Sequence, residues 1–162
     1  MSMGTECHHQ EGAREGLAGG RLTEALGHAE RLCTARDERL TTSRQRVLEL
    51  LLRSNGPLKA YDLIAAFGQD GTPSKPPTVY RALEFLERQG FAHRIEGLNA
   101  YVPCRINGVG HRAAFLICDC CGAAKEFEPD AETQRAATTA SGYQIRALTL
   151  EAYGLCPACQ GR

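Results

Sequence analysis

The stretch SKPPTVYRALEFLERQGFAHRIEGLNAYVPC, residues 74–104, changes its hydrophobic period partway along. Apolar residues in its first half recur at helical spacing: Val79, Leu83 and Leu86. Pro77 suits the first turn of that helix, and Gly90 suits its end. After Gly90, the segments FAHRI and AYVPC alternate with a period of two around EGLN, where Gly97 and Asn99 favour a turn. The stretch therefore predicts a helix followed by a β-hairpin.

Three further helices are predicted upstream. RLTEALGHAERLCTARD (21–37) has an apolar stripe that includes Cys33, which we interpret as a core residue. Two more helices are predicted in RLTTSRQRVLELLLRSNGP (39–57) and KAYDLIAAFG (59–68). Thr41, Thr42 and Ser43 are N-cap candidates for the helix in 39–57. Several helices followed by a two-stranded hairpin form a winged helix-turn-helix, in which the helix before the hairpin enters the DNA major groove.

The exposed face of that last helix is suited to DNA. With Val79, Ala82, Leu83 and Leu86 turned inward, the N-terminal end presents four polar residues: Lys75, Thr78, Tyr80 and Arg81. Arginine can read guanine through two hydrogen bonds, and a helix N-terminus favours phosphate. A solvated polar face would have the same composition, but the adjoining hairpin favours DNA binding.

The second half of the chain has a different organisation. RAAFLIC (112–118) and GAAKEFEP (122–129) are predicted strands around a cysteine-rich turn, and DAETQRAATTASGY (130–143) is a predicted helix with an aspartate cap. YQIRALTLEAYGLC (143–156) alternates as a strand does. The overall prediction is an α+β protein with an N-terminal winged helix-turn-helix and a small C-terminal α/β domain.

Two Cys-x-x-Cys pairs in this half predict one closed zinc site. Cys118 and Cys121, with Cys156 and Cys159, supply the four thiolates of a tetrahedral structural zinc. A thiol-redox role for CPAC is disfavoured, because that chemistry needs a following helix and only three residues follow. The spacing leaves Cys120 as a spare thiol.

A second group of metal-capable residues lies around the hairpin and beyond it. It comprises two imidazoles, a thiolate and a carboxylate: His93, Cys104, His111 and Glu126. Zinc suits such a mixture, whereas iron(II) favours more nitrogen and oxygen. His28 with the late cysteine pair also has the pattern of a zinc deaminase, but Leu155 stands where that motif has proline. A zinc enzyme would also need an open coordination position, which four protein ligands do not leave.

Composition fits a soluble, cytoplasmic protein. Apolar residues make up 43% and charged residues 23%, and the N-terminus has no apolar segment of the signal-peptide kind. We therefore expect no membrane partner, and reduced cysteines that are available to a metal. The net charge of zero is uneven, since residues 21–105 hold 13 Lys and Arg against 10 Asp and Glu. This weakly favours nucleic acid on the first half.

Three segments together resemble one family: KPPTVYRALEFLERQGFAHRIEGLNAYVPC (75–104), FLICDCCGAAKE (115–126) and EAYGLCPAC (151–159). The sequence resembles the ferric uptake regulator superfamily and, within it, the zinc uptake regulator branch, over about residues 22–159. The resemblance implies a homodimeric repressor activated by zinc that binds a palindromic DNA operator, is not an enzyme and uses no small-molecule substrate. It assigns two Zn²⁺ per monomer, one structural on the four paired cysteines and one sensing on His93, Cys104, His111 and Glu126. It also adds Tyr61 to the DNA contacts.

The expected organisation is a flexible tail (1–20), a winged-helix DNA-binding domain (21–104), a hinge (105–111) and a dimerisation domain (112–162).

Two departures from the family's sequence pattern count against a further metal site and against an iron or peroxide sensor. Arg112 and Ala113 follow His111, so the family's His-x-His run is absent, and Tyr153 stands where a histidine is common. A sensor of another metal or of peroxide remains the alternative within this fold.

Overall fold

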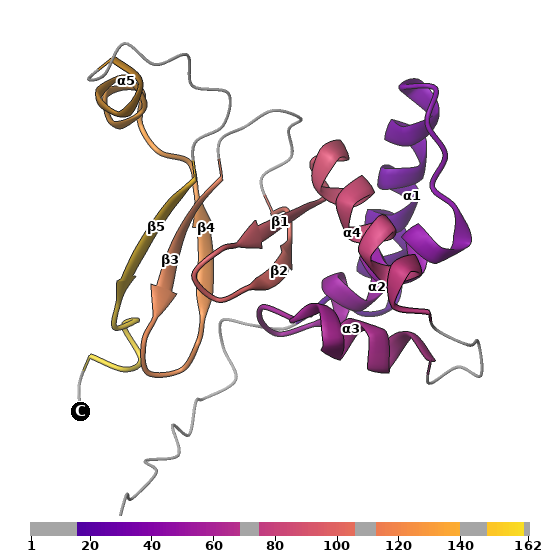
Figure 1. Cartoon of the computed structure of the whole chain (residues 1–162), viewed down its shortest axis with the longest axis horizontal. Helices are drawn as coiled ribbons and strands as arrows, with labels where there is room; N and C mark the ends of the chain where they lie inside the picture. Colours follow the sequence, from indigo (N-terminus) through magenta and orange to yellow (C-terminus); the bar gives the residue numbers. More distant parts are fainter. Residues whose placement is uncertain (1–15, 69–74, 106–112, 140–148, 161–162) are drawn as a thin grey trace, which may run out of the picture. The chain divides into compact units, whose positions relative to one another are not determined.

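The computed structural model describes residues 16–68, 75–105, 113–139 and 149–160, in two compact units. The N-terminal unit (13–109) contains α1 Gly19–Ala35, α2 Thr42–Arg53, α3 Ala60–Phe67, α4 Pro76–Gln89, β1 Ala92–Ile95 and β2 Ala100–Pro103. The C-terminal unit (110–162) contains β3 Ala114–Cys118, β4 Ala124–Phe127, α5 Ala131–Thr139 and β5 Leu150–Gly154 (Figure 1). In the part of the chain that the structure describes, none of the helices combines the length and apolarity needed to cross a membrane.

The core of the N-terminal unit lies between α2, α3 and α4. Val47, Leu51, Leu63 and Leu86 are completely buried there, and Cys33 of α1 is 1% exposed, as its place on the apolar stripe predicts. Helix α1 begins at Gly19, two residues before the predicted start, and α2 follows Thr41, whose side chain makes no capping hydrogen bond.

Helix α4 buries a wider face than the sequence analysis assigned. Val79, Ala82, Leu83 and Leu86 are buried as predicted, and Phe85 is buried as well at 1% exposure. The guanidinium of Arg44 lies 3.5 Å from the centroid of the Phe85 ring, so this side of the helix is covered by a cation–π contact rather than by solvent.

A glycine forms the corner between α4 and the hairpin. Gly90 has φ 76° and ψ 22°, a left-handed conformation that costs a residue with a β-carbon about 1–2 kcal/mol. Strand β1 then pairs antiparallel with β2, and Asn99 (φ 47°) occupies the turn between them. Leu58 exchanges two backbone hydrogen bonds with Tyr101, which ties the hairpin back to the segment before α3.

We expect Gly90→Ala to lower the free energy of unfolding by about 1 kcal/mol, because alanine must adopt the left-handed conformation at this corner. Urea unfolding monitored by circular dichroism would measure the change. Gly56→Ala is the matched control, since an added β-carbon there has no neighbour within 4 Å. Equal stability of both variants and the wild type would contradict the role given to Gly90.

The described residues of the C-terminal unit form a three-stranded sheet in the order β4-β3-β5. Strand β3 pairs antiparallel with β4 and parallel with β5, so that Cys118 at the end of β3 lies beside Gly154 at the end of β5. The predicted aspartate cap is present before α5: the Thr133 N–H donates to Asp130 Oδ1 at 2.7 Å, and this bond lowers the pKa of Asp130. Of the strand predicted over 143–156, the structure describes β5, while residues 140–148 lie outside the described part.

Candidate metal centre and helix surface

Four cysteines meet where β3 and β5 end. The sulfurs of Cys118, Cys121, Cys156 and Cys159 all lie within 4.8 Å of one another. The sulfur–sulfur distance between Cys121 and Cys156 is 3.8 Å, which is the separation expected for two ligands of a tetrahedral zinc with Zn–S bonds of about 2.3 Å. This donor set fits a zinc ion, and because four protein ligands close the coordination shell, it suits a structural rather than a catalytic site.

Two tight turns hold these cysteines. In the first, Gly122 has φ 69° and donates its N–H to the carbonyl of Cys118; in the second, the Cys159 N–H donates to the carbonyl of Cys156. The Asp119 N–H donates to the Gly154 carbonyl at 2.8 Å and so joins the two turns. The parallel pairing of β3 with β5 thus brings together residues 35 positions apart in sequence.

The pKa shifts of the cysteine thiols in this cluster are consistent with a site that binds a cation. The Cys156 N–H donates to Cys118 Sγ at 3.3 Å, and this bond, together with hydrogen bonds from Cys121 and Cys120, lowers the pKa of the Cys118 thiol to about 6. Burial raises the pKa of Cys159, since a buried thiolate without a counter-charge is unfavourable. A divalent cation would compensate the thiolates. Cys120 is exposed in the turn and is not one of the four grouped sulfurs.

The hairpin brings two further predicted ligands together. Ligand atoms of His93, on β1, and Cys104, just after β2, lie within 4.8 Å of each other in the N-terminal unit. The Cys104 N–H donates to the Phe91 carbonyl at 2.9 Å, which continues the antiparallel pairing past the end of β2. Glu126 lies on β4 of the C-terminal unit, opposite Phe115. His111 lies outside the described residues.

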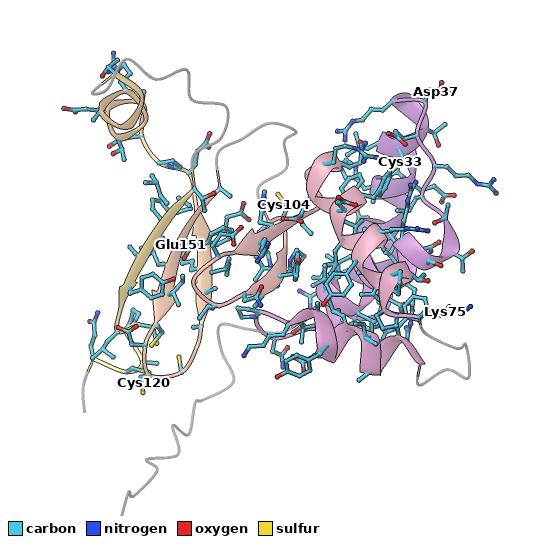
Figure 2. All side chains as sticks on the ribbon, in the orientation of Figure 1. Cys33, Asp37, Lys75, Cys104, Cys120 and Glu151 are labelled. Carbon is cyan, nitrogen blue, oxygen red and sulfur yellow. The ribbon has the colours of Figure 1, made fainter. Side chains whose placement is uncertain are left out.

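The predicted DNA-contact residues are accessible. Lys75, labelled in Figure 2, precedes α4 and is exposed. Arg81 is also exposed, Tyr80 is 52% exposed and Thr78 is half-buried. Tyr61, on α3, is 65% exposed. The sequence analysis missed Lys59, whose ammonium lies 5.9 Å from the centroid of the Tyr61 ring and adds positive charge to this surface. Its position at the start of the predicted helix 59–68 was the available signal.

We expect Cys33→Ala to leave the zinc content unchanged, because Cys33 lies buried in the helical core and outside both groups of candidate ligands. The lost sulfur contacts should lower the free energy of unfolding by about 1 kcal/mol. Metal analysis and urea unfolding check the two parts. Cys7→Ala, outside the described residues, should also retain all zinc, and loss of a zinc equivalent in either variant would show that the sites are wrongly assigned.

A unit of helices followed by a hairpin, with a second unit that ends in a four-cysteine cluster, defines a two-unit α+β protein with a candidate tetrathiolate metal centre. The sequence model of the Ferric uptake regulator family matches residues 35–153. The chain therefore belongs to the ferric uptake regulator family. Members of this family are transcription regulators, so the prediction that the chain is not an enzyme is confirmed.

Similar proteins point to one branch of the family. The zinc uptake regulation protein of Escherichia coli (strain K12) is 42% identical over 139 residues, which are 84% of this chain and 81% of that protein. A structure described as a zinc uptake regulator complexed with zinc and DNA is 39% identical, covers 86% of this chain and 95% of its own, and has a TM-score of 0.81. The crystal structure of holo XcZur is 41% identical, covers 83% and 95%, and has a TM-score of 0.74. The predicted resemblance is confirmed.

Proposed function

We propose that this chain is a zinc-responsive transcriptional repressor of zinc-uptake genes that binds a palindromic DNA operator as a homodimer. The observation that carries the proposal is the likeness, at 39% identity and over 86% of the chain, to a regulator solved with zinc and DNA. The four-cysteine cluster and the pairing of His93 with Cys104 provide the donors such a regulator requires. Double-stranded DNA and a second copy of the chain are the proposed partners.

The N-terminal unit would bind DNA as a winged helix-turn-helix, with α4 in the major groove and β1–β2 as the wing. Support comes from the exposed polar residues at the N-terminal end of α4 and from Tyr61 on the preceding helix. Arg81 would read a base edge, and Lys75, Thr78, Tyr80 and Tyr61 would contact phosphates or bases. This domain spans residues 21–104 and is followed by a hinge at 105–111.

Dimerisation would use the C-terminal domain, residues 112–162. Strand β5 lies at the edge of the sheet, and Tyr153 and Leu155, at its end and just beyond, are each about half exposed. Leu116 on β3 is likewise 47% exposed. Among the described strands β5 is an edge strand, and an edge strand with apolar neighbours favours pairing with another strand, such as the same edge of a second copy.

The proposed metal content is two Zn²⁺ per monomer. Cys118, Cys121, Cys156 and Cys159 would hold a structural zinc, and His93, Cys104, His111 and Glu126 would hold the sensing zinc. The sensing ligands are divided between the two units, so shared coordination would fix the separation of the two α4 helices in a dimer. To shift the protein from mostly DNA-incompetent to mostly DNA-competent, zinc must bind the DNA-competent arrangement more tightly than the other arrangement by about 5.5 kcal/mol.

Operator binding under controlled metal tests the proposal. Zinc should increase operator affinity in a gel-shift titration, and the same free concentration of iron(II) or manganese(II) should not. Mild chelation should reduce two zinc per monomer to one and lower operator affinity by about 100-fold. Selective activation by iron, or loss of binding on peroxide treatment, would instead identify a sensor of another metal or of peroxide.

Arg81→Ala should weaken operator binding by about 10- to 100-fold and reduce discrimination between bases, because a two-pronged arginine–guanine contact contributes about 1–3 kcal/mol. Dimerisation and zinc content should not change. Gel shifts at one fixed salt concentration measure the effect, since phosphate contacts make affinity salt-dependent. Arg53→Ala, on the exposed end of α2, is the control. Unchanged operator affinity of Arg81→Ala would contradict the role given to α4.

A further inference from the structure

The N-terminal unit contains a cleft that the proposed function does not use. Its volume is about 640 Å³, and it lies between α1, the middle and end of α2, and the corner that joins α4 to β1. Much of its wall is apolar, with side chains from three parts of the unit: Leu17, Leu32, Leu48, Leu52 and Phe91. A volume in this range, with apolar walls, is typical of sites that bind small molecules.

The polar part of the cleft is predominantly cationic. Arg21, Arg31 and Arg36 line it with His28, and Glu24 is the carboxylate among the lining residues. Arg36 is held in place, since its Nη1 donates to the carbonyl of Gln89 at 2.9 Å and to Gln89 Oε1 at 3.1 Å. The guanidinium of Arg36 also lies 5.8 Å from the centroid of the Phe91 ring. This charge distribution complements a small anion with an apolar body.

The cleft also reaches a proposed zinc ligand. Cys104, labelled in Figure 2, is one of its lining residues. Its N–H donates to the carbonyl of Phe91, another lining residue. The Cys104 sulfur lies within 4.8 Å of a ring nitrogen of His93. A molecule bound in the cleft would therefore lie beside a thiolate of the sensing site and could replace that thiolate as a zinc ligand.

We propose that this cleft binds an anionic low-molecular-weight thiol, which removes zinc from the sensing site by exchange at Cys104. The inference rests on the proposed function, because it requires Cys104 to be a zinc ligand. The carboxylates of the entering molecule pair with the cleft arginines, and its sulfur forms a bond to zinc as the bond from Cys104 Sγ breaks. The proton that the entering thiol loses is taken by Cys104, and no electrons are transferred. Sulfur is the donor that competes best with a thiolate ligand for zinc.

Kinetics of zinc release test the proposal on the full-length protein loaded with zinc. Reduced glutathione, a tripeptide thiol with a net negative charge at neutral pH, is the probe, and a chromogenic chelator reports the released metal. The release rate should rise with glutathione concentration and then saturate, with a maximal acceleration of about tenfold or more. S-methylglutathione, which retains the charges but lacks the thiol, should inhibit this acceleration. The proposal would be overturned if the zinc-release rate rose linearly with glutathione concentration and equalled the rate measured with β-mercaptoethanol at the same thiolate concentration.

A charge variant provides the second measurement. Arg21→Gln combined with Arg31→Gln should raise the glutathione concentration for half-maximal release about tenfold, because two charge-assisted contacts are lost. Arg53→Gln replaces an exposed arginine of α2 that does not line the cleft, and it should behave as the wild type. Half-saturation of the double variant equal to that of the wild type would exclude the cleft.

The same samples separate this proposal from the proposed function. The wild type should carry a second zinc that a chelator removes and that His93→Ala lacks. If this zinc is absent from the wild type, the sensing site is wrongly assigned and both proposals fail. If that zinc is present and glutathione does not accelerate its release with saturation, the cleft proposal fails and the proposed function stands.

Discussion

Cys121→Ser should lose zinc, stable dimerisation and the cooperative unfolding of the C-terminal unit together. The serine hydroxyl replaces a thiolate in a cluster whose four sulfurs lie within 4.8 Å of one another. Structural zinc contributes about 10–16 kcal/mol in zinc-finger peptides, as much as or more than the total stability of most domains. The described sheet of this unit has only three short strands, and few other contacts replace that contribution.

Calorimetric melting, sedimentation and metal analysis measure these three losses. Cys156→Ser should fail in the same way, because both cysteines belong to the cluster. Cys120→Ser is the matched control, since Cys120 lies in the same turn, is exposed and is not one of the four grouped sulfurs. It should retain the zinc, the dimer and the melting transition. A Cys121→Ser protein that remains a zinc-responsive dimer would refute the structural role of this cluster.

Cys104→Ser should instead abolish the response to zinc without unfolding the protein. Cys104 follows β2 in the N-terminal unit, whose core is formed by α2, α3 and α4 and does not depend on this thiol. If the sensing zinc shifts the chain from about 1% to about 99% DNA-competent, its loss lowers operator affinity by about 100-fold in saturating zinc. One zinc per monomer, the dimer and the residual, zinc-independent operator affinity should remain.

Gel shifts in zinc-buffered solution, with metal counts on the same preparation, check this expectation, and His93→Ala should reproduce it. By linkage, operator DNA should tighten zinc binding in the wild type and should not do so in Cys104→Ser. Unfolding of Cys104→Ser, with Cys121→Ser intact and responsive, would show that the structural and sensing roles have been exchanged.

Local patterns predicted the N-terminal unit well because its elements are consecutive along the chain. The left-handed Gly90 after α4 and the buried Cys33 follow from residue type and spacing. The burial of Phe85 was missed, since Phe85 lies beside the stripe formed by Val79, Leu83 and Leu86, and a contact with Arg44, from a different helix, covers it. Such a contact depends on how α2 packs against α4, and the hydrophobic periodicity of a sequence carries no information about that packing.

The cysteines of the candidate metal centre could be predicted from the sequence, but the strand pairing that brings them together could not. Spacing selected Cys118, Cys121, Cys156 and Cys159, and the structure brings these four together. The parallel pairing of β3 with β5 was not predicted, because alternation identifies a strand but not its partner or direction. The hairpin, by contrast, needs only a short turn, so the sequence alone placed His93 and Cys104 on two strands that pair with each other, and the structure supplies their register.

The parallel pairing of β3 with β5 also has a consequence for how the chain is made. Cys121 and Cys156 are 35 positions apart, so their meeting is a late, non-local event, and closing such a loop costs about 3 kcal/mol of chain entropy. During synthesis the N-terminal unit emerges first and can fold while the last cysteine pair is still inside the ribosome. If the four cysteines hold the proposed structural zinc, completion of the second unit then waits for metal. Newly made chains in a zinc-poor cell would remain half folded and open to proteolysis, which ties the amount of the protein, as well as its activity, to the supply of zinc.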